Sequence, residues 1–299
     1  MQKIVATIGI FDGVHRGHQE ILKRLVREAK SQNAKSLVVT FHPHPRKVLG
    51  SASQIPLLTS LDHRIRLIKA LGADSFLVIR FTKSFSRMKA ETFLKETLMR
   101  KLDIKALVVG RNFLFGYRGK GNFSLLKRMS KKYGFRICGV KPVKVKSTYV
   151  SSTRIRRAIE KGDLKNASLM LGRPVTVLGT VVKGKRVGRK LGFPTANIDP
   201  HHEAIPPSGV YAVDVRIAKK NYKGILNIGI RPTFTRSHIE GPHDRYIEPT
   251  IELHILNFKR DIYKKDMEII FKRKIRNEKR FASVEALRKQ IKLDTLRAK

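Results

Sequence analysis

Residues 9–18 read GIFDGVHRGH and concentrate three glycines and two histidines near the start of the chain. Glycines let a ligand approach the backbone closely, and two imidazoles three residues apart can donate hydrogen bonds to phosphate oxygens. An apolar run at 4–8 precedes this segment, and apolar residues at helical spacing follow it. We therefore expect a turn between a first strand and a first helix, whose N-terminus attracts anions. The chemistry that this turn favours is the binding of a triphosphate.

Two further segments follow apolar runs in the first half. His42 and His44 alternate with prolines after the run at 37–41. They either lie near a bound nucleotide or are solvated in a rigid loop; with no cysteine or carboxylate nearby, a zinc site is not expected. Asn112 and Phe113 follow the run at 106–109. An amide and an aromatic ring can hydrogen-bond a base or other ring and stack on it, or the phenylalanine can simply pack into the core.

Three later segments carry polar side chains at defined positions. Residues 151–156 read SSTRIR, and three hydroxyls with an arginine at a helix start form either a second phosphate cradle or a plain helix cap. Residues 188–197 read GRKLGFPTAN, where Thr195 and Asn197 offer the neutral oxygen ligands that suit Mg²⁺, unless the segment is only a polar turn. Residues 251–256 alternate, so Glu252 and His254 share one face of a strand.

The elements that must position these groups fall into two patterns. Up to about residue 145, buried-type strands at 4–8, 37–41, 76–79, 106–109 and 137–140 alternate with helical patterns at 62–71, 90–102 and 123–133. This alternation predicts a doubly wound parallel sheet of the Rossmann-like α/β class. After residue 173, β-rich runs at 176–182, 209–215, 224–230, 250–256 and 268–271 follow each other without helices, and an amphipathic helix at 283–293 ends the pattern. These features predict an antiparallel β-barrel with a closing helix.

Composition narrows the class of protein. The chain has 299 residues, one cysteine and no apolar run near the ~20 residues of a membrane helix, so we expect a cytoplasmic protein of two domains with no membrane association. Its formal net charge of +41 is unusual and predicts weak association with polyanions. The basic residues are spread along the chain without a basic tail, so a dedicated nucleic-acid-binding protein is the lesser alternative.

The opening segment resembles the HxGH signature of nucleotidyltransferases, whose two histidines hold the phosphates of ATP during adenylyl transfer. Its longer spelling is similar to the amino-terminal module of the prokaryotic bifunctional riboflavin kinase and FAD synthetase family. Further segments resemble that family in order along the chain: TFHPHP at 40–45, GRNFLFG at 110–116, SSTRIR at 151–156, GRKLGFPTAN at 188–197, NIGIRPTF at 227–234, IELHIL at 251–256 and IRNEKRF at 275–281.

The resemblance implies roles for individual residues. His15 and His18 are implied to be catalytic in adenylyl transfer, and Glu252 to activate the ribityl 5′-hydroxyl in phosphorylation. Asn112, Phe113 and Arg276 are the implied flavin contacts, and Thr195 and Asn197 the implied Mg²⁺ ligands. The implied nucleotide- and phosphate-binding residues are Gly9, Phe11, Asp12, Gly13, Gly17, Ser152, Thr153, Arg156, Gly188, Lys190 and Gly192.

The resemblance also implies the reactions and their division along the chain. A domain at 173–299 is implied to phosphorylate riboflavin with ATP to FMN. A domain at 1–172 is implied to transfer AMP from a second ATP to FMN, giving FAD and pyrophosphate. Riboflavin, FMN and ATP are then the partners, and Mg²⁺ the cofactor. Activity of only one half stays open as an alternative, and nothing indicates an oligomeric state. Asn257 and Lys264 depart from the family, which usually has Asp and Gly there, and the loop 235–249 has no assigned role.

Overall fold

The chain forms two compact units in the computed structural model, which describes residues 2–50, 56–100, 102–184, 192–218, 220–230 and 249–298. The first unit comprises Met1–Ile155 with Met170–Gly172, and the second comprises Arg156–Leu169 with Arg173–Lys299. Residues 156–169 therefore group with the second unit, although the boundary was expected at residue 172. One contact that joins them to the barrel is at Gly162, where a Cβ atom would stand 3.6 Å from the ring of Pro207. The assignment of 156–169 to the first domain stays a prediction.

The first unit is built on a five-stranded parallel sheet with the order β3-β2-β1-β4-β5. All five strands coincide with apolar runs that predicted them: β1 (Ile4–Ile8), β2 (Lys35–His42), β3 (Ser75–Arg80), β4 (Ile104–Gly110) and β5 (Arg136–Val140). The chain winds outward from β1 to one edge and then returns to β4 on the other side of β1. The loops after β1 and β4 therefore flank the switch point, where open α/β sheets bind ligands.

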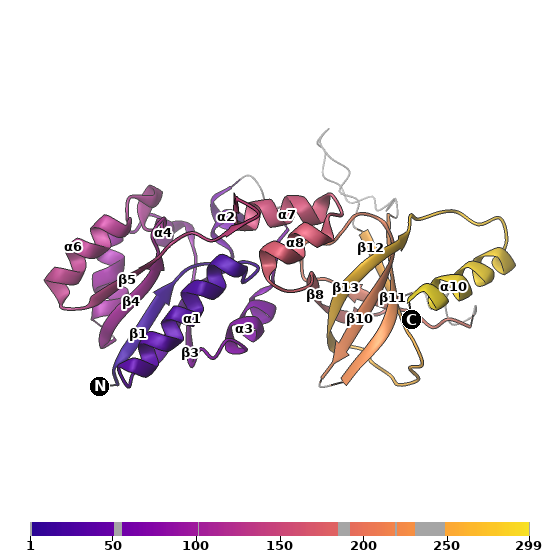
Figure 1. Ribbon diagram of the computed structural model, residues 1–299, viewed down its shortest axis with the longest axis horizontal. Helices are drawn as coiled ribbons and strands as arrows, with labels where there is room; N and C mark the ends of the chain where they lie inside the picture. Colours follow the sequence, from indigo (N-terminus) through magenta and orange to yellow (C-terminus); the bar gives the residue numbers. More distant parts are fainter. Residues whose placement is uncertain are drawn as a thin grey trace. The chain divides into compact units, whose positions relative to one another are not determined.

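Helices cover the two faces of this sheet (Figure 1). α1 (Arg16–Ser31) and α3 (Leu61–Lys69) pack on one face through Leu22, Leu25 and Ile68. The other face is covered by η1 (Phe93–Met99) and α6 (Phe123–Tyr133). The short elements of the unit are α2 (Pro45–Leu49), α4 (Lys83–Ser86), α5 (Ala90–Thr92), η2 (Tyr117–Gly119) and the hairpin of β6 (Lys144–Val145) with β7 (Thr148–Tyr149).

One helix differs from its prediction. The segment expected as a single helix over 90–102 begins as α5 and continues as a π-helix, η1, in which Arg100 donates to the carbonyl five residues earlier, at Lys95. Over seven residues, apolar spacing does not distinguish a π-helix from an α-helix. The wider winding still buries Phe93, Leu94 and Leu98 in the core.

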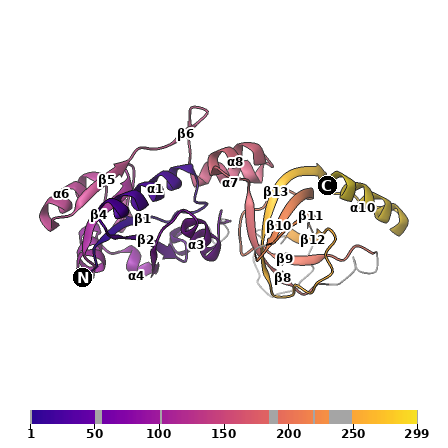
Figure 2. The same cartoon turned by 60° about the horizontal axis from the view of Figure 1, so that its bottom comes forward.

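The second unit is a closed antiparallel barrel in which the strands follow the order β10-β11-β12-β9-β8-β13 (Figure 2). This confirms the expected barrel with a closing helix, α10 (Val284–Ala298). The strands are β8 (Thr176–Val182), β9 (Ala196–Asp199), β10 (Gly209–Ile217), β11 (Lys220–Ile230), β12 (Pro249–Ile255) and β13 (Asp266–Arg276), preceded by α7 (Ser152–Glu160) and α8 (Leu164–Leu171). The strand β9 was not expected, because its first two residues lie within the segment 188–197 that was interpreted as a loop.

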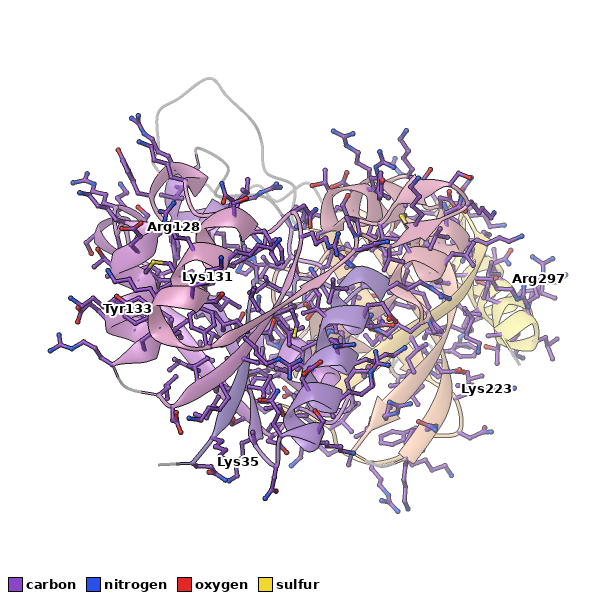
Figure 3. All side chains as sticks on the ribbon, turned by 60° about the vertical axis from the view of Figure 1, so that its left-hand side comes forward. Lys35, Arg128, Lys131, Tyr133, Lys223 and Arg297 are labelled. Carbon is purple, nitrogen blue, oxygen red and sulfur yellow. The ribbon has the colours of Figure 1, made fainter. Side chains whose placement is uncertain are left out.

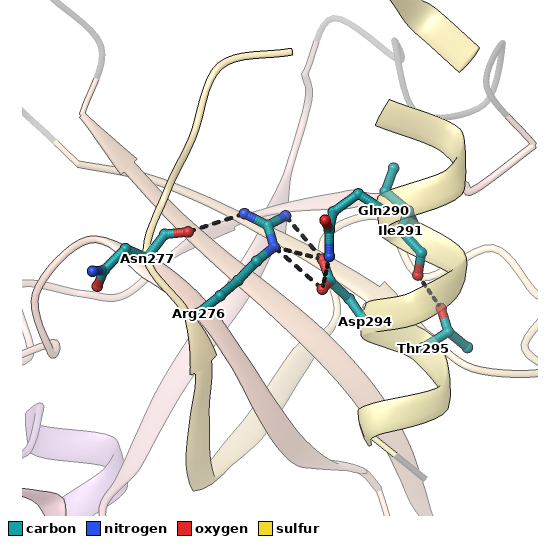
Figure 4. A network of polar contacts seen from close by, with 6 residues as sticks. All are labelled: Arg276, Asn277, Gln290, Ile291, Asp294 and Thr295. Carbon is teal, nitrogen blue, oxygen red and sulfur yellow. Dashed lines mark hydrogen bonds and ion pairs between the residues drawn. The ribbon is translucent and has the colours of Figure 1, made fainter. Parts of the chain in front are cut away.

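A buried ion pair fastens the closing helix to the barrel (Figure 4). Arg276 at the end of β13 reaches Asp294 of α10 through Nε at 2.9 Å and Nη2 at 2.8 Å. Gln290 donates to the same carboxylate at 2.9 Å, and Arg276 Nη1 donates to the carbonyl of Asn277 at 3.0 Å. The Asp294 side chain is only 2% exposed, so these donors take the place of water around its oxygen atoms.

Replacement of Asp294 by alanine is expected to lower the free energy of unfolding of the barrel by about 3–5 kcal/mol, because it leaves the Arg276 guanidinium buried without its counter-charge. Urea unfolding of the full chain measures this. The double variant Arg276→Met with Asp294→Leu removes both charges and is expected to recover most of the loss. Equal destabilisation by the single and double changes would contradict the expectation.

Candidate functional site

The turn after β1 has a strained backbone. Phe11 and Val14 have φ values of 53° and 40°, and Gly13 lies between them at 82°. A positive φ is costly for a β-branched valine and is characteristic of functional sites. The Val14 amide donates to the Phe11 carbonyl at 3.0 Å, which closes the turn.

Asp12 holds this turn in place. Its carboxylate is buried and accepts from the amides of Leu58 and Thr59 at 3.0 and 3.1 Å. Thr59 in turn accepts from the Gly13 amide through its hydroxyl at 2.9 Å. Asp12 and the buried ring of Phe11 thus stabilise the conformation of the turn. Their contact with a nucleotide stays a prediction.

His15 and His18 stand at the N-terminus of α1. His15 is the N-cap residue, and its Nδ1 accepts from the His18 amide at 3.4 Å. The two rings stack with centroids 3.6 Å apart at 17°, so the histidines share one face as their spacing predicted. A Cβ atom at Gly17 would stand 3.3 Å from the His15 ring, and one at Gly9 would stand 2.9 Å from the Phe11 ring. Glycine at both positions lets the turn close tightly around the histidines.

Arg64 of α3 lies beneath the same turn. Its Nη1 donates to the Ile10 carbonyl at 2.5 Å and its Nη2 to the Phe41 carbonyl at 3.5 Å, so the guanidinium ties the ends of β1 and β2 together. Sequence reasoning missed this residue. The signal was available, because an arginine four residues before Ile68 on the apolar face of a helix is expected to have a buried partner.

The surroundings of His18 disfavour its protonation. Burial, then the neighbouring His15 and Arg64, hold the pKa of His18 well below its ordinary value of 6.5. Its Nδ1 atom is buried and makes no hydrogen bond to another described residue. A neutral imidazole with an unused buried nitrogen, at the N-terminus of a sixteen-residue helix, can receive an anionic ligand and a proton together.

Because the unfolded chain binds the His18 proton more tightly than the folded protein, the free energy of unfolding is expected to fall as pH decreases below about 6.5. The contribution of this one group is limited to about 1.4 kcal/mol per pH unit. Urea unfolding at pH 7.5 and 5.5 measures it, and His18→Gln is expected to flatten the dependence. Parallel pH dependences for the two proteins would contradict this assignment.

Two other predicted residues lie near this site, Ser152 against the turn and Asn112 beside α1. Ser152, at the start of α7, donates from its hydroxyl to the Asp12 carbonyl at 3.0 Å, which brings the SSTRIR segment against the first turn. Asn112 follows β4, and its Oδ1 stands 3.1 Å from where a Cβ of Gly110 would be. That position also faces Ile21 of α1 at 3.6 Å. The amide is therefore at the switch point beside α1.

Other candidates have structural partners of their own. Phe113 stacks on the buried Phe115 ring with centroids 5.4 Å apart. Arg276 carries the ion pair with Asp294 described above. Arg156 is buried and belongs to the second unit, and Thr153 follows Ser152 on α7. His44 caps α2 by accepting from the Arg46 amide at 3.1 Å. Ligand contacts by these residues stay predictions.

In the second unit, the barrel brings three polar residues side by side. Glu252 on β12 pairs with Asn197 on β9 and with Asn227 on β11. Residues directly opposite each other on paired strands project from the same face. Ile251 and Leu253 on either side of Glu252 are buried, so this face is the one turned away from the barrel core. The carboxylate is thus flanked by an amide on each neighbouring strand.

The segment before β9 approaches this row closely. A Cβ atom at Gly184 would overlap the side-chain amide of Asn197, so only glycine leaves that amide room. Gly192 has a φ of 84°, and Thr195 is half-buried two residues before Asn197. Gly188 and Lys190, as well as residues 231–248 with most of the loop 235–249, lie outside the described residues.

Comparisons with known proteins match both units. A family model described as FAD synthetase matches residues 1–154, and one described as riboflavin kinase matches residues 171–299. The bifunctional riboflavin kinase/FMN adenylyltransferase of Escherichia coli K12 is 36% identical over 296 residues, which cover 99% of this chain and 91% of that protein. The protein of the same description from Haemophilus influenzae is 36% identical over 300 residues, covering 100% and 94%.

A solved structure shares the fold along nearly the whole chain. A Streptococcus pneumoniae protein described as a macrolide-efflux protein superposes with a TM-score of 0.82 at 30% identity, covering 99% of this chain and 93% of that one. In the part of the present chain that the structure describes, no helix combines the length and apolar character needed to cross a bilayer.

Proposed function

The chain belongs to the family of bifunctional riboflavin kinases and FMN adenylyltransferases, and from that premise we propose which residues carry each reaction. The protein phosphorylates riboflavin with ATP to FMN and then joins AMP from a second ATP to FMN, giving FAD and pyrophosphate. We assign the second reaction to residues 1–172 and the first to residues 173–299. Both reactions use ATP, and we place the protein in the cytoplasm, where ATP and flavins are available.

We assign adenylyl transfer to the turn at the switch point. His15 and His18 would hold the triphosphate of ATP at the N-terminus of α1, together with the backbone around Gly9, Gly13 and Gly17. The stacked rings and the unused buried nitrogen of His18 support this. A phosphate oxygen of FMN then attacks the α-phosphorus while pyrophosphate leaves, and the histidines neutralise the charge that develops on the leaving group.

We assign riboflavin phosphorylation to the row formed by Asn197, Glu252 and Asn227. The observation that carries this assignment is the strand register that sets Glu252 directly between the two amides. Glu252 would accept the proton of the ribityl 5′-hydroxyl as that oxygen attacks the γ-phosphorus and ADP leaves. The row lies on the face turned away from the apolar barrel core, so riboflavin and ATP can reach it.

Thr195 and Asn197 fit a magnesium ion. Both offer neutral oxygen atoms, the kind of ligand that Mg²⁺ accepts alongside ATP phosphates. The Asn197 amide occupies the space that a Cβ atom at Gly184 would fill, so glycine there leaves the amide its place. When bound, Mg²⁺ would neutralise charge on the transferred phosphoryl group. Glu252, one strand away from Asn197, remains the group that takes the proton.

Incubation of the protein with riboflavin, ATP and Mg²⁺, followed by chromatography of the flavins, tests the proposed sites. FMN should appear first and FAD later, and chelation of Mg²⁺ should stop both. The variants Thr195→Ala and Asn197→Ala are expected to raise the Mg²⁺ concentration needed for FMN formation, without changing that needed for FAD formation from supplied FMN. An equal shift in both requirements would contradict the assignment of the metal ligands.

We also propose that the protein associates weakly with polyanions, and one groove favours this. A groove of about 490 Å³ lies between α1 and the edge strand β5 in the first unit. Its charged lining consists of Arg24, Arg27, Arg136 and Glu20, and the buried Glu28 forms ion pairs with Arg24 and Arg136. Lysines and arginines also project from other elements (Figure 3). Such a field attracts phosphate-bearing chains in a salt-dependent way.

Cys138 reports on this association, because it is the sole cysteine of the chain and lines the groove. A short single-stranded RNA is expected to slow the reaction of Cys138 with a thiol reagent at low salt, and added salt should remove the protection. Arg27→Gln with Arg136→Gln should remove it as well. If RNA does not change the reactivity of Cys138 at low salt, the proposed association with polyanions is wrong. That result would not bear on the assignment of flavin synthesis.

A further inference from the structure

We propose that His254 is a positioning residue of the riboflavin kinase reaction, which holds the peptide between Pro194 and Thr195 in the orientation that nucleotide and metal binding require. The proposal rests on the assignment of that reaction to Glu252, Thr195 and Asn197. Among the described hydrogen bonds, His254 makes none to Thr195 or Asn197. It acts through the backbone of the segment that carries them.

A hydrogen bond ties the described residues just before β9 to β12. The Nδ1 atom of His254 lies 2.8 Å from the carbonyl oxygen of Pro194. A carbonyl oxygen carries no hydrogen, so the ring nitrogen must donate, and His254 therefore has its proton on Nδ1. The ring of Phe193 meets the imidazole edge to face, with centroids 5.7 Å apart at 81°. The histidine thus contacts two successive residues of the segment.

This hydrogen bond controls Thr195 through the geometry of the peptide bond. The carbonyl of Pro194 and the amide of Thr195 lie in one rigid plane. The proline ring fixes φ at residue 194 and restricts the conformation of Phe193 before it. Once His254 holds the carbonyl, little freedom remains in the backbone that leads into Thr195. The hydroxyl of Thr195 is then presented from a fixed position.

The same strand carries the candidate base. His254 and Glu252 are two residues apart on β12, so they project from one face of the strand. Glu252 pairs with Asn197 through β9, and His254 reaches the residue just before Thr195. β12 is therefore linked to β9 by strand pairing and to the residues before β9 by the histidine. The two links together set the distance between the base and the two metal-binding side chains.

Loss of this hydrogen bond is expected to affect kinase kinetics more than stability. The contact lies at the barrel surface, where one hydrogen bond contributes little to folding. A displacement of about 1 Å in a group that positions the substrate, in contrast, costs as much as 10²-fold in rate. His254→Ala should therefore lower kcat/KM for FMN formation by about 10- to 100-fold. The KM for MgATP should rise more than the KM for riboflavin.

Three variants separate positioning from a general structural role. The side-chain amide nitrogen of asparagine occupies nearly the place of Nδ1, so His254→Asn can still donate to the Pro194 carbonyl and should recover most of the activity. His254→Gln extends its amide toward the place of Nε2 and should not recover it. His201→Ala is the matched control, since His201 contacts Thr180 at the other end of β9. It should keep kinase activity within about twofold, as distant surface changes do.

Each variant is assayed in the full chain for FMN formation and, with supplied FMN, for FAD formation, which should stay unchanged throughout. Glu252→Gln is assayed in parallel. If Glu252→Gln abolishes FMN formation while His254→Ala retains it within twofold, the positioning role is wrong and the kinase site stands. Equal loss in His254→Asn and His254→Gln, or equal rises in both KM values with a lower melting temperature, would also overturn the role. If Glu252→Gln is active, the kinase assignment itself is wrong.

Discussion

Replacement of Glu252 by glutamine is expected to lower FMN formation by about 10²–10⁴-fold, the range that a general base contributes. Glutamine keeps the size of the side chain and its pairing with Asn197 and Asn227, but it cannot accept the proton of the ribityl hydroxyl. FAD formation from supplied FMN should continue at the original rate, because that reaction is assigned to the other unit. Separate assays with riboflavin and with FMN, resolved by flavin chromatography, measure both.

The matched control is Glu268→Gln on β13, which removes a carboxylate from the same barrel. Glu268 forms an ion pair with Arg216 at 3.0 Å and lies on a different strand from Glu252. Its loss should leave FMN formation within about threefold, since a partly exposed ion pair contributes little. If Glu252→Gln lowers both reactions equally, the two activities do not have separate sites. If it lowers neither, the proton acceptor is another group.

Replacement of His18 by alanine is expected to produce the opposite separation. FAD formation should fall by about 10²–10³-fold, the loss typical for one donor that stabilises developing charge. FMN formation from riboflavin should continue, so FMN should accumulate. His18 is the better choice than His15, because the His15 ring also caps α1 and its loss would disturb the helix. Measurement of pyrophosphate release alongside FAD identifies the step that is lost.

A second variant controls for packing at this position. His18→Gln retains a hydrogen-bond donor in the space beneath Phe11, whose ring meets His18 edge to face at 5.3 Å. It should recover part of the activity if donation to the phosphate is the role of the residue. Equal loss in the alanine and glutamine variants, with unchanged stability, would favour a role that requires the imidazole proton. Normal FAD formation in both would remove His18 from the mechanism.

The sequence alone predicted most of the elements, because their signals are local. Alternation of apolar runs with helical spacing located the five strands of the sheet, and the change to strands without helices at residue 173 located the barrel. The motif-bearing turn was placed between β1 and α1 for the same reason. Its two histidines are three residues apart on a helix start, and this spacing by itself dictates that they share a face.

The sequence did not predict contacts between residues that are far apart in the chain. The nucleotide contact expected of Asp12 stays a prediction, and the structure adds that its carboxylate accepts from the amides of Leu58 and Thr59. The sequence did not indicate a role for Arg64, because its acceptors are Ile10 in the turn after β1 and Phe41 in β2, both far away in the chain. Arg276 was expected at the flavin, and the structure adds its ion pair with Asp294 on the closing helix.

By itself, then, the sequence determined the class of each half, the position of the glycine- and histidine-rich turn, and the family to which the chain belongs. Only the tertiary structure decided which strands are neighbours. The order β3-β2-β1-β4-β5 makes the first turn a switch point, and the pairing of β9 with β12 sets Asn197 beside Glu252. The physical reason is that helical and strand propensities act over a few residues, whereas strand order and register are selected by the burial of side chains far apart in the chain.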